Sequence, residues 1–237
     1  KSGKGFRVNS KFDSRNYFLQ FKYQFSKKSS VKTEFTLLNY LAQQAGGLND
    51  QMFEENPFQS NRSRNWFELD WFLYQTVFSH SFSEESNFKF QFFGLEANRK
   101  ALGFRSNRVS QIDPMEERDL IFGNFSNYGF ETRWLSHYSL FGKKVIFLIG
   151  NKWYSAQNDS SQGAGSDSSG PDFMFYNDNF PGYPYQSFYK YPNRNLAFFS
   201  EHIFYLSNKL SATPGVRYEL IDTRSNGYFR KINFDAA

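Results

Sequence analysis

The feature that most constrains this chain is a period-two alternation of apolar and polar side chains. In residues 210–227, LSATPGVRYELIDTRSNG, the apolar Leu210, Val216 and Tyr218 alternate with the charged Arg217 and Glu219. This period places the apolar groups on one face of a β-strand and the charged groups on the other face. The same pattern recurs along the chain and predicts an all-β, antiparallel fold.

Eight segments follow the pattern, and their connections are alternately short and long. The first three predicted strands are 16–26, 31–42 and 65–82, the fourth carries Phe88, Phe90 and Phe92, and the others are 128–140, 145–154, 195–206 and 210–227. Tight turns are expected near 27–29, 83–85, 142–144 and 207–209, and long connections at 43–64, 101–126 and 155–194. We expect β-bulges at 71–74, where the phase blurs, and at 213–215, because Pro214 cannot donate to a strand ladder.

Strands of about ten residues with short turns at one end and long loops at the other are typical of a transmembrane β-barrel. The bilayer also explains the composition, because only every second side chain of each strand faces lipid. Aromatic residues make up 21% of the chain, although its mean hydropathy is −0.67. A soluble β-sandwich also alternates and is the alternative fold, but its turns do not separate so strictly into short and long sets.

A transmembrane barrel makes a definite prediction for the two faces of the sheet. Charges at mid-depth on the lipid face cost about 2–4 kcal/mol, so the rings should face lipid and the charges should face the lumen. The predicted lipid set is Phe21, Tyr23, Phe90, Phe92, Trp134, Tyr138, Val216 and Tyr218. The predicted lumen set is Lys22, Lys89, Arg133, Glu201, Arg217 and Glu219.

Several stretches are similar to one family of proteins. LSATPGVRYELIDT resembles a strand of TonB-dependent outer-membrane receptors, notably the ferric-citrate and ferric-siderophore group, and NRNLAFFSEHIFYLSNKLSATPGVRYEL resembles the whole hairpin. FGLEANRKALGFRSNR, GFETRWLSHYSLFGKKVIFLIGNKWY and GFRVNSKFDSRNYFLQFKYQFS resemble earlier parts of the same barrel, in the family's order. The abundance of Tyr and Phe resembles sequences from Bacteroidota-like bacteria.

The resemblance implies a barrel of about 22 strands, filled by an N-terminal plug domain. Such receptors lie in the bacterial outer membrane among its lipid and lipopolysaccharide, and import a ferric siderophore or ferric citrate with energy delivered through TonB. Residues 1–237 are then expected to be part of a single barrel domain, about eight strands without the plug or the final strands. The alternative functions are a scaffold barrel in a larger outer-membrane assembly and a passive small barrel.

The chain shows no pattern that predicts catalysis or a bound cofactor. It has no cysteine, and its three histidines, His80, His137 and His202, share no metal-ligand spacing. Asp159, Asp167 and Asp172 could hold calcium, but their spacing fits no EF-hand. We therefore predict no enzyme activity, no resident metal and no nucleic-acid partner.

Arginines in or beside the long connections are the candidate ligand-binding residues. A ferric chelate such as ferric citrate is anionic, and guanidinium pairs with carboxylate through two parallel hydrogen bonds. The candidates are Arg62, Arg64, Arg99, Arg105, Arg108 and Arg118, of which Arg105 and Arg108 are expected at the barrel mouth. Solvated loops, or contacts with lipopolysaccharide phosphates, remain the alternative for each of them.

Overall fold

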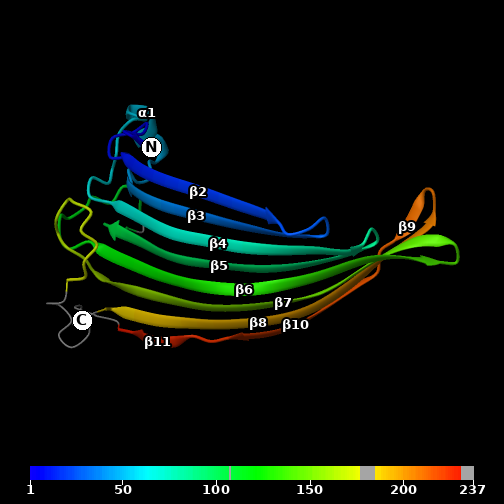
Figure 1. The fold of residues 1–237 in the computed structure, drawn as a ribbon. Helices are drawn as coiled ribbons and strands as arrows, with labels where there is room; N and C mark the ends of the chain where they lie inside the picture. The colour runs from blue at the N-terminus through cyan, green and yellow to red at the C-terminus, as the bar shows by residue number, and fades with distance from the viewer. Residues whose placement is uncertain (107, 177–184, 231–237) are drawn as a thin grey trace.

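The chain forms one open, curved antiparallel sheet. The computed structural model describes residues 1–106, 108–176 and 185–230. The long strands are β2 (Phe12–Gln24), β3 (Ser29–Gln43), β4 (Trp66–Ser83), β5 (Ser86–Gly103), β6 (Asp119–Leu140), β7 (Lys143–Ala164) and β8 (Ser187–Ser207). Each pairs with the next in chain order, which is a simple up-and-down meander (Figure 1).

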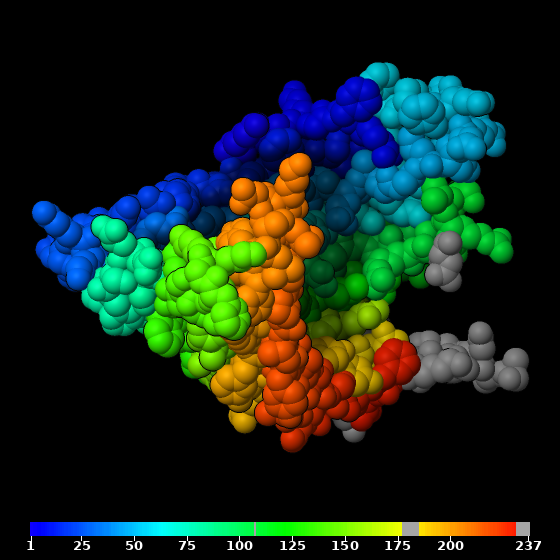
Figure 2. Space-filling view, turned by 90° about the vertical axis from the view of Figure 1, so that its right-hand side faces the viewer, coloured from blue at the N-terminus to red at the C-terminus, as the bar shows by residue number. Residues whose placement is uncertain are grey.

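The eighth strand is interrupted, and the sheet remains open at both edges. β9 (Leu210–Ala212), β10 (Gly215–Thr223) and β11 (Asn226–Phe229) all pair with β8, and the short β1 (Ser2–Gly3) pairs with β2 at the opposite edge. In the end-on view, the blue N-terminal strand and the red C-terminal strand lie at opposite margins of the molecule (Figure 2). Within the described residues, the eight strands are therefore not a closed small barrel.

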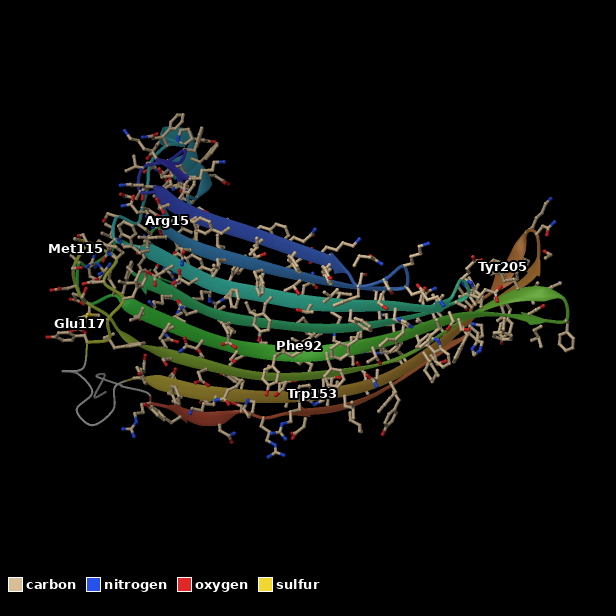
Figure 3. All side chains as sticks on the ribbon, in the orientation of Figure 1. Arg15, Phe92, Met115, Glu117, Trp153 and Tyr205 are labelled. Carbon is tan, nitrogen blue, oxygen red and sulfur yellow. The ribbon has the colours of Figure 1, made fainter. Side chains whose placement is uncertain are left out.

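The short turns gather at one end of the sheet and the long connections at the other, as the sequence predicts (Figure 1). The turns occupy residues 25–28, 84–85, 141–142 and 208–209, so the predicted positions are displaced by one or two residues. In Figure 3, Met115 and Glu117 lie at the loop end and Tyr205 near the turn end. The first long connection contains a short helix that we did not predict, α1 (Asp50–Glu55), capped by the Asn49 side chain.

Among the described residues, no helix is both long enough and apolar enough to span a bilayer.

β6, β7 and β8 extend eight to ten residues further toward the loop end than predicted. Residues 119–126, 155–164 and 187–194 were expected in long connections but belong to the sheet. They contain Gly, Asn, Asp and Ser and lack an apolar alternation, because polar groups lie on both faces at this end. Backbone pairing continues through the segments of β6 and β7 and between β7 and β8, and it overrides their weak strand propensity.

Neither predicted bulge is present, and both corrections have a physical reason. The pairing of β4 with β3 and β5 runs through Trp71–Tyr74 without a shift, because both faces of the sheet are apolar at this level. At Pro214 the strand simply breaks: Ala212 pairs with Phe204 and Gly215 pairs with Glu201, so the register is the same on both sides. The His202 N–H still donates to the Pro214 carbonyl at 2.9 Å.

The two predicted sets of side chains lie on opposite faces of the sheet. The register aligns Tyr23, Phe90 and Tyr218 in one row across the sheet, and Lys89 and Arg133 in the next row on the other face. All eight residues of the predicted lipid set share one face, here called the ring face. All six of the predicted lumen set, including Arg133, Glu201, Arg217 and Glu219, share the opposite face, here called the charged face.

In the turn-end half of the ring face, two pairs of polar side chains meet across strands. The Thr33 and Thr76 hydroxyls lie 3.1 Å apart, and the Thr132 hydroxyl donates to the Asn151 amide oxygen at 3.0 Å. A hydroxyl without a partner is costly in hydrocarbon, and these pairings remove that cost. The ring face can therefore lie against lipid along most of its turn-end half.

The stagger of the turns gives the strand tilt. Each successive turn lies further along the sheet than the previous one, by roughly one residue per strand crossed. With a rise of about 3.3 Å per residue and strands about 4.8 Å apart, this stagger corresponds to a tilt of roughly 40°. The rings of β6 run from Tyr128 to Tyr138, which at that tilt covers about 25 Å, the height of the apolar band of a membrane barrel.

The assignment of the two faces is testable by site-directed spin labelling in a lipid bilayer. The chain has no cysteine, so single cysteines can be placed at the adjacent Arg217 and Tyr218. We expect the label at Tyr218 to collide mainly with oxygen, which dissolves in lipid, and the label at Arg217 to collide mainly with a water-soluble nickel chelate. Power-saturation measurements giving the reverse order would show that the ring face does not contact lipid.

Candidate functional site: the loop base and the inner wall

Two buried arginines join the three long connections at their bases. The connections are 44–65, 104–118 and 165–186, of which 107 and 177–184 lie outside the described residues. Arg64 precedes β4 and Arg118 precedes β6, and each side chain is about 1% exposed. The loops therefore lie together at one end of the sheet, as predicted, and a guanidinium group holds them at each of two points.

Arg64 lies in the first loop and contacts both of the others. Its Nε and one terminal nitrogen donate to the two carboxylate oxygens of Asp113 at 3.0 and 2.6 Å. The same guanidinium donates to the backbone carbonyls of Glu116 and Asp167. This planar, two-point pairing with a carboxylate is the geometry that favours arginine over lysine.

Arg118 makes the equivalent set of contacts from the second loop. It donates to the Arg64 carbonyl in the first loop at 2.9 Å and, in the third loop, to the carbonyls of Ser166 and Gly170. One terminal nitrogen also reaches the Asp172 carboxylate at 2.5 Å. Arg64 and Arg118 together form what we call the arginine clasp.

The pKa values of the two acids follow from this packing. Burial acts to raise the pKa of Asp113, but hydrogen bonds from Arg64 and from the Met115 N–H outweigh it and leave this pKa below its ordinary value. For Asp172, burial again acts to raise the pKa, and the Ser166 and Ser168 hydroxyls with Arg118 lower it further than burial raises it. Both carboxyl groups are therefore charged at neutral pH and complete the clasp.

The six candidate arginines divide into two groups of three. Arg62 is also buried: it donates to the Gln111 carbonyl and the Ser106 hydroxyl, and lies over the Phe104 ring. The guanidinium groups of Arg62, Arg64 and Arg118 are thus directed at protein partners. They hold the loops together, and the ligand-binding role expected for them stays a prediction.

The other three candidates are exposed. Arg99 projects from the charged face of β5, and its guanidinium lies 5.9 Å from the centre of the Phe125 ring. Arg105 and Arg108 lie in the second loop, just beyond the end of β5. Burial raises the pKa of Asp119, and the positive charge and the backbone N–H of Arg105 partly offset this rise. The charge of Arg105 is thus partly compensated by Asp119.

In its loop-end half, the charged face carries a wall of rings. This aromatic wall consists of Phe18, Trp71, Phe93, Phe125 and Tyr154, from five strands. Phe18, Phe93 and Tyr154 line a hollow of about 450 Å³. The Trp71 indole N–H and the Asn127 and Asn158 amide oxygens on this face are buried without a hydrogen-bond partner. The wall therefore offers a flat apolar surface, and these polar atoms are not exposed on it.

Nearer the turns, the same face is strongly charged. Lys22, Lys32, Lys89, Glu131 and Arg133 line a second hollow of about 470 Å³. Of the predicted lumen residues, Arg133 pairs with Glu131, and Arg217 pairs with Glu219, in each case two residues away on the same strand. Glu201 lies on this face too, on β8. Both ion pairs therefore join residues of one strand and do not cross to a neighbouring strand.

Sequence reasoning missed the acids of the clasp and the free groups of the wall. Asp113 and Asp172 lie in loops without a repeating pattern, and nothing local in the sequence reveals their partners. A signal for the arginines does exist in the sequence. Arg64 lies two residues before β4 and Arg118 one residue before β6, and each of these strands is the first strand of a hairpin. The three aspartates considered for calcium do not meet, and no group of three metal-ligating side chains occurs in the part of the chain that is described.

Comparison with known proteins was made by sequence and by structure. No family model and no curated protein matches the chain by sequence. The structure matches the ferric citrate transporter FecA in its unliganded form, with a TM-score of 0.79 and 17% identity over 93% of this chain and 31% of that one. The fold is that of the barrel of TonB-dependent receptors.

Two further solved structures show the same arrangement of strands. The ferric preacinetobactin receptor BauA from Acinetobacter baumannii matches with a TM-score of 0.67 and 9% identity, over 95% of this chain and 38% of that one. FpvA of P. aeruginosa, solved with a pyoverdine–iron complex, matches with a TM-score of 0.71 and 11% identity, over 95% and 32%. These neighbours are transporters and receptors, not enzymes, and the chain spans about a third of their length.

The clasp makes a prediction about loop stability. Replacing Arg118 by Met leaves the part-exposed Asp172 carboxylate without its cation and removes the hydrogen bonds from the guanidinium to the Ser166 and Gly170 carbonyls. A hydrogen bond to a charged group contributes about 1.5–3 kcal/mol. We expect amide hydrogen exchange in residues 165–176 to accelerate strongly while exchange in β4–β7 stays slow. Arg224→Met is the control, because its pair with Asp222 is exposed and should not affect the loops. Unchanged exchange in Arg118→Met would exclude the clasp as the element that orders the third loop.

The lowered pKa values give the clasp a defined pH dependence. A carboxyl whose pKa is lower in the folded than in the unfolded state stabilises the fold above the unfolded value, and this stabilisation is lost as the pH falls through the folded value. The ordinary value for Asp113 and Asp172 is 3.8. We expect the loops to stay protected from pH 7 down to that value and to open only below it. Exchange rates, corrected for their intrinsic pH dependence, that rise already between pH 6 and 5 would contradict this.

Proposed function

We propose that the intact receptor containing this chain imports an anionic ferric chelate, a ferric siderophore or ferric citrate, across the bacterial outer membrane. The support is the match of the whole sheet to the barrels of a ferric citrate transporter and of two ferric siderophore receptors. The membrane location is supported by the ring face, whose rings cover about the height of the apolar band of a bilayer.

The observation that carries the proposed ligand is the arrangement of cations above the aromatic wall. Arg99, Arg105 and Arg108 are exposed around the end of β5, and Arg99 lies directly over the Phe125 ring of the wall. An anionic chelate can place its carboxylate or phenolate oxygens on these guanidinium groups and its carbon skeleton on the rings. Arg108 is the leading candidate, since Arg105 shares its charge with Asp119.

Import also needs partners outside this chain. We propose that an N-terminal plug contacts the charged hollow near the turns, where Lys22, Lys89 and Arg133 supply excess positive charge. TonB would then act on the plug, and the chain's own contribution would be the wall along which the plug moves. Surface charges of opposite sign on plug and wall would set the register between them.

The test is uptake and binding by the full-length receptor carrying Arg99→Ala, Arg105→Ala and Arg108→Ala together. Charge-assisted hydrogen bonds contribute about 1.5–3 kcal/mol each, so binding of ferric citrate or of the producing strain's own siderophore should weaken at least about tenfold. The loss should be largest at low salt, because screening already weakens exposed charges at high salt.

Arg15→Ala is the matched control, since Arg15 is exposed, lies on the ring face and pairs with Asp13. It should bind the chelate as the wild type does. Unchanged affinity of the triple variant at both low and high salt would remove these arginines from the ligand site. A neutral or cationic transported ligand would overturn the electrostatic part of the proposal.

A further inference from the structure

Two phenylalanine rings on the charged face lie over glycines of β6. Phe125 lies over Gly123, where an added Cβ would be 3.1 Å from two carbons of the ring. Phe93 lies over Gly129, where an added Cβ would be 3.0 Å from the ring. Both glycines are buried and both rings are half-buried. Each glycine therefore makes room for a ring close to the backbone of the sheet, and the open side of that ring faces the lumen.

Each of these rings has a cation of its own. The Arg99 guanidinium lies 5.9 Å from the centre of the Phe125 ring, and the Lys152 Nζ lies 5.3 Å from the centre of the Phe93 ring. Neither cation forms an ion pair within the described part of the chain. Glu131, which is opposite Lys152 in the register, pairs instead on its own strand. We call each ring with its cation a platform.

The first platform lies in a part of the charged face that has few other charges. From the row of Phe18 to the loop end, the described residues of this face carry two charged side chains, Arg99 and, at the margin, Asp119. The Phe93 platform lies four residues nearer the turns, at the row where the charges begin with Glu34. The two platforms therefore lead from the mouth toward the charged rows.

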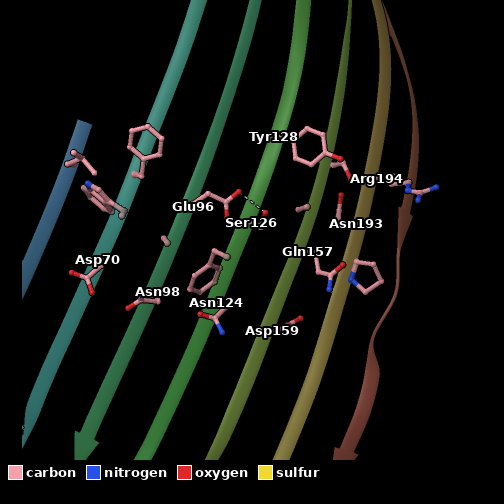
Figure 4. A pocket seen from close by; sticks show the side chains of 18 of the residues that line it. Asp70, Glu96, Asn98, Asn124, Ser126, Tyr128, Gln157, Asp159, Asn193 and Arg194 are labelled. Carbon is pink, nitrogen blue, oxygen red and sulfur yellow. Dashed lines mark hydrogen bonds between the residues drawn. The ribbon is translucent and has the colours of Figure 1, made fainter. Parts of the chain in front are cut away.

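The ring face at the level of the first platform is polar. The row between Arg99 and Phe125 consists on that face of Arg15, Asn39, Asp70, Asn98, Asn124, Asp159 and Lys190. Figure 4 shows the middle of this row, from Asp70 on β4 to Asp159 on β7. Lipid lies outside the barrel, so contact with lipid does not explain the rings of the charged face at this level.

A platform suits a group that is aromatic and anionic at the same time. Such a group can stack its ring on the phenylalanine and direct its charged oxygen to the neighbouring cation. Catecholates and phenolates have this structure, because their anionic oxygens are bonded directly to an aromatic ring. Citrate carries its anionic oxygens on a saturated skeleton, so it can meet the cation but cannot stack on the ring.

We propose that the chelate recognised by this wall binds iron through aryl oxygens, as catecholates and phenolates do, and that it is not ferric citrate. The inference rests on the proposed import of a ferric chelate and narrows that ligand to one chemical class. An aryl group meets the Phe125 platform first, at the mouth, and the Phe93 platform about 13 Å further along the strands. The likeness to a ferric citrate transporter then extends to the fold and not to the ligand.

The first test compares three chelates of radioactive iron by equilibrium dialysis against the intact receptor in detergent. They are a tris-catecholate, citrate as the anionic chelate without rings, and an aliphatic tris-hydroxamate as the chelate with neither rings nor excess negative charge. We expect the tris-catecholate to bind at least about tenfold more tightly than the other two, because these lack the stacked rings.

The outcomes separate this inference from the proposed function. Ferric citrate bound as tightly as the tris-catecholate, or more tightly, would overturn the inference and leave the import of a ferric chelate standing. Failure of the receptor to bind or take up any of the three chelates would overturn both.

The second test removes the two rings and keeps their cations. Phe93→Leu/Phe125→Leu should bind the tris-catecholate about tenfold more weakly and should bind citrate as the wild type does. Tyr74→Leu is the matched control, because the Tyr74 ring also lies over a glycine, Gly94, but on the ring face. It should bind both chelates normally. Equal binding of the tris-catecholate by the wild type and by the folded double variant would overturn the proposal and assign the rings to packing against the plug.

A third measurement depends neither on iron nor on how the double variant folds. Saturation-transfer NMR compares two fragments at millimolar concentration on the wild-type receptor: 2,3-dihydroxybenzoate, which is an aryl unit of a tris-catecholate, and cyclohexanecarboxylate, which is an anion without an aromatic ring. Transfer to the aryl fragment alone, removed by competing tris-catecholate, supports the platforms. Equal transfer to both fragments, or transfer to neither, would overturn the proposal.

Discussion

The structure depends on one constraint: each strand has only two faces, and the side chains on each face must match the medium they contact at each level along the strand. The antiparallel ladder from β2 to β8 pairs the backbone of the inner strands with both neighbours, so there the side chains respond to the surroundings. On the ring face the surroundings change from lipid to headgroups, and rings give way to amides and acids. On the charged face they change in the opposite sense, from a charged band near the turns to an aromatic wall near the loops.

This double change explains which parts of the fold the sequence could predict. Near the turns, apolar and charged residues alternate strictly, and the strands containing Phe90 or Tyr218 were placed on the correct face. Near the loops both faces are mixed, and the alternation disappears although the pairing continues. The outer parts of β6 and β7 were therefore taken for loops, and the apolar faces on both sides of Trp71 were taken for a bulge. The helix α1 was missed because it has only six residues.

The candidate site was predictable in its residue type but not in the role of each residue. Six arginines stood out because a guanidinium group suits an anionic ligand, and that argument does not distinguish a cation that meets a ligand from one that meets a carboxylate of its own chain. The distinction depends on Asp113 and Asp172, which come from loops that meet only in the folded state. Burial then separates Arg62, Arg64 and Arg118 from Arg99, Arg105 and Arg108. No short-range pattern in the sequence carries that information.

The position of the clasp has a consequence for how such a barrel can diversify. Arg64 and Arg118 hold the loops at their roots, next to the first residues of β4 and β6, and their partners include backbone carbonyls that any residue can supply. Among the described loop residues, the side chains that pair with the clasp are those of Asp113, Ser166, Ser168 and Asp172. Insertions and replacements at the tips can therefore accumulate without loosening the roots, and related barrels can acquire new ligand preferences while the wall beneath them stays the same.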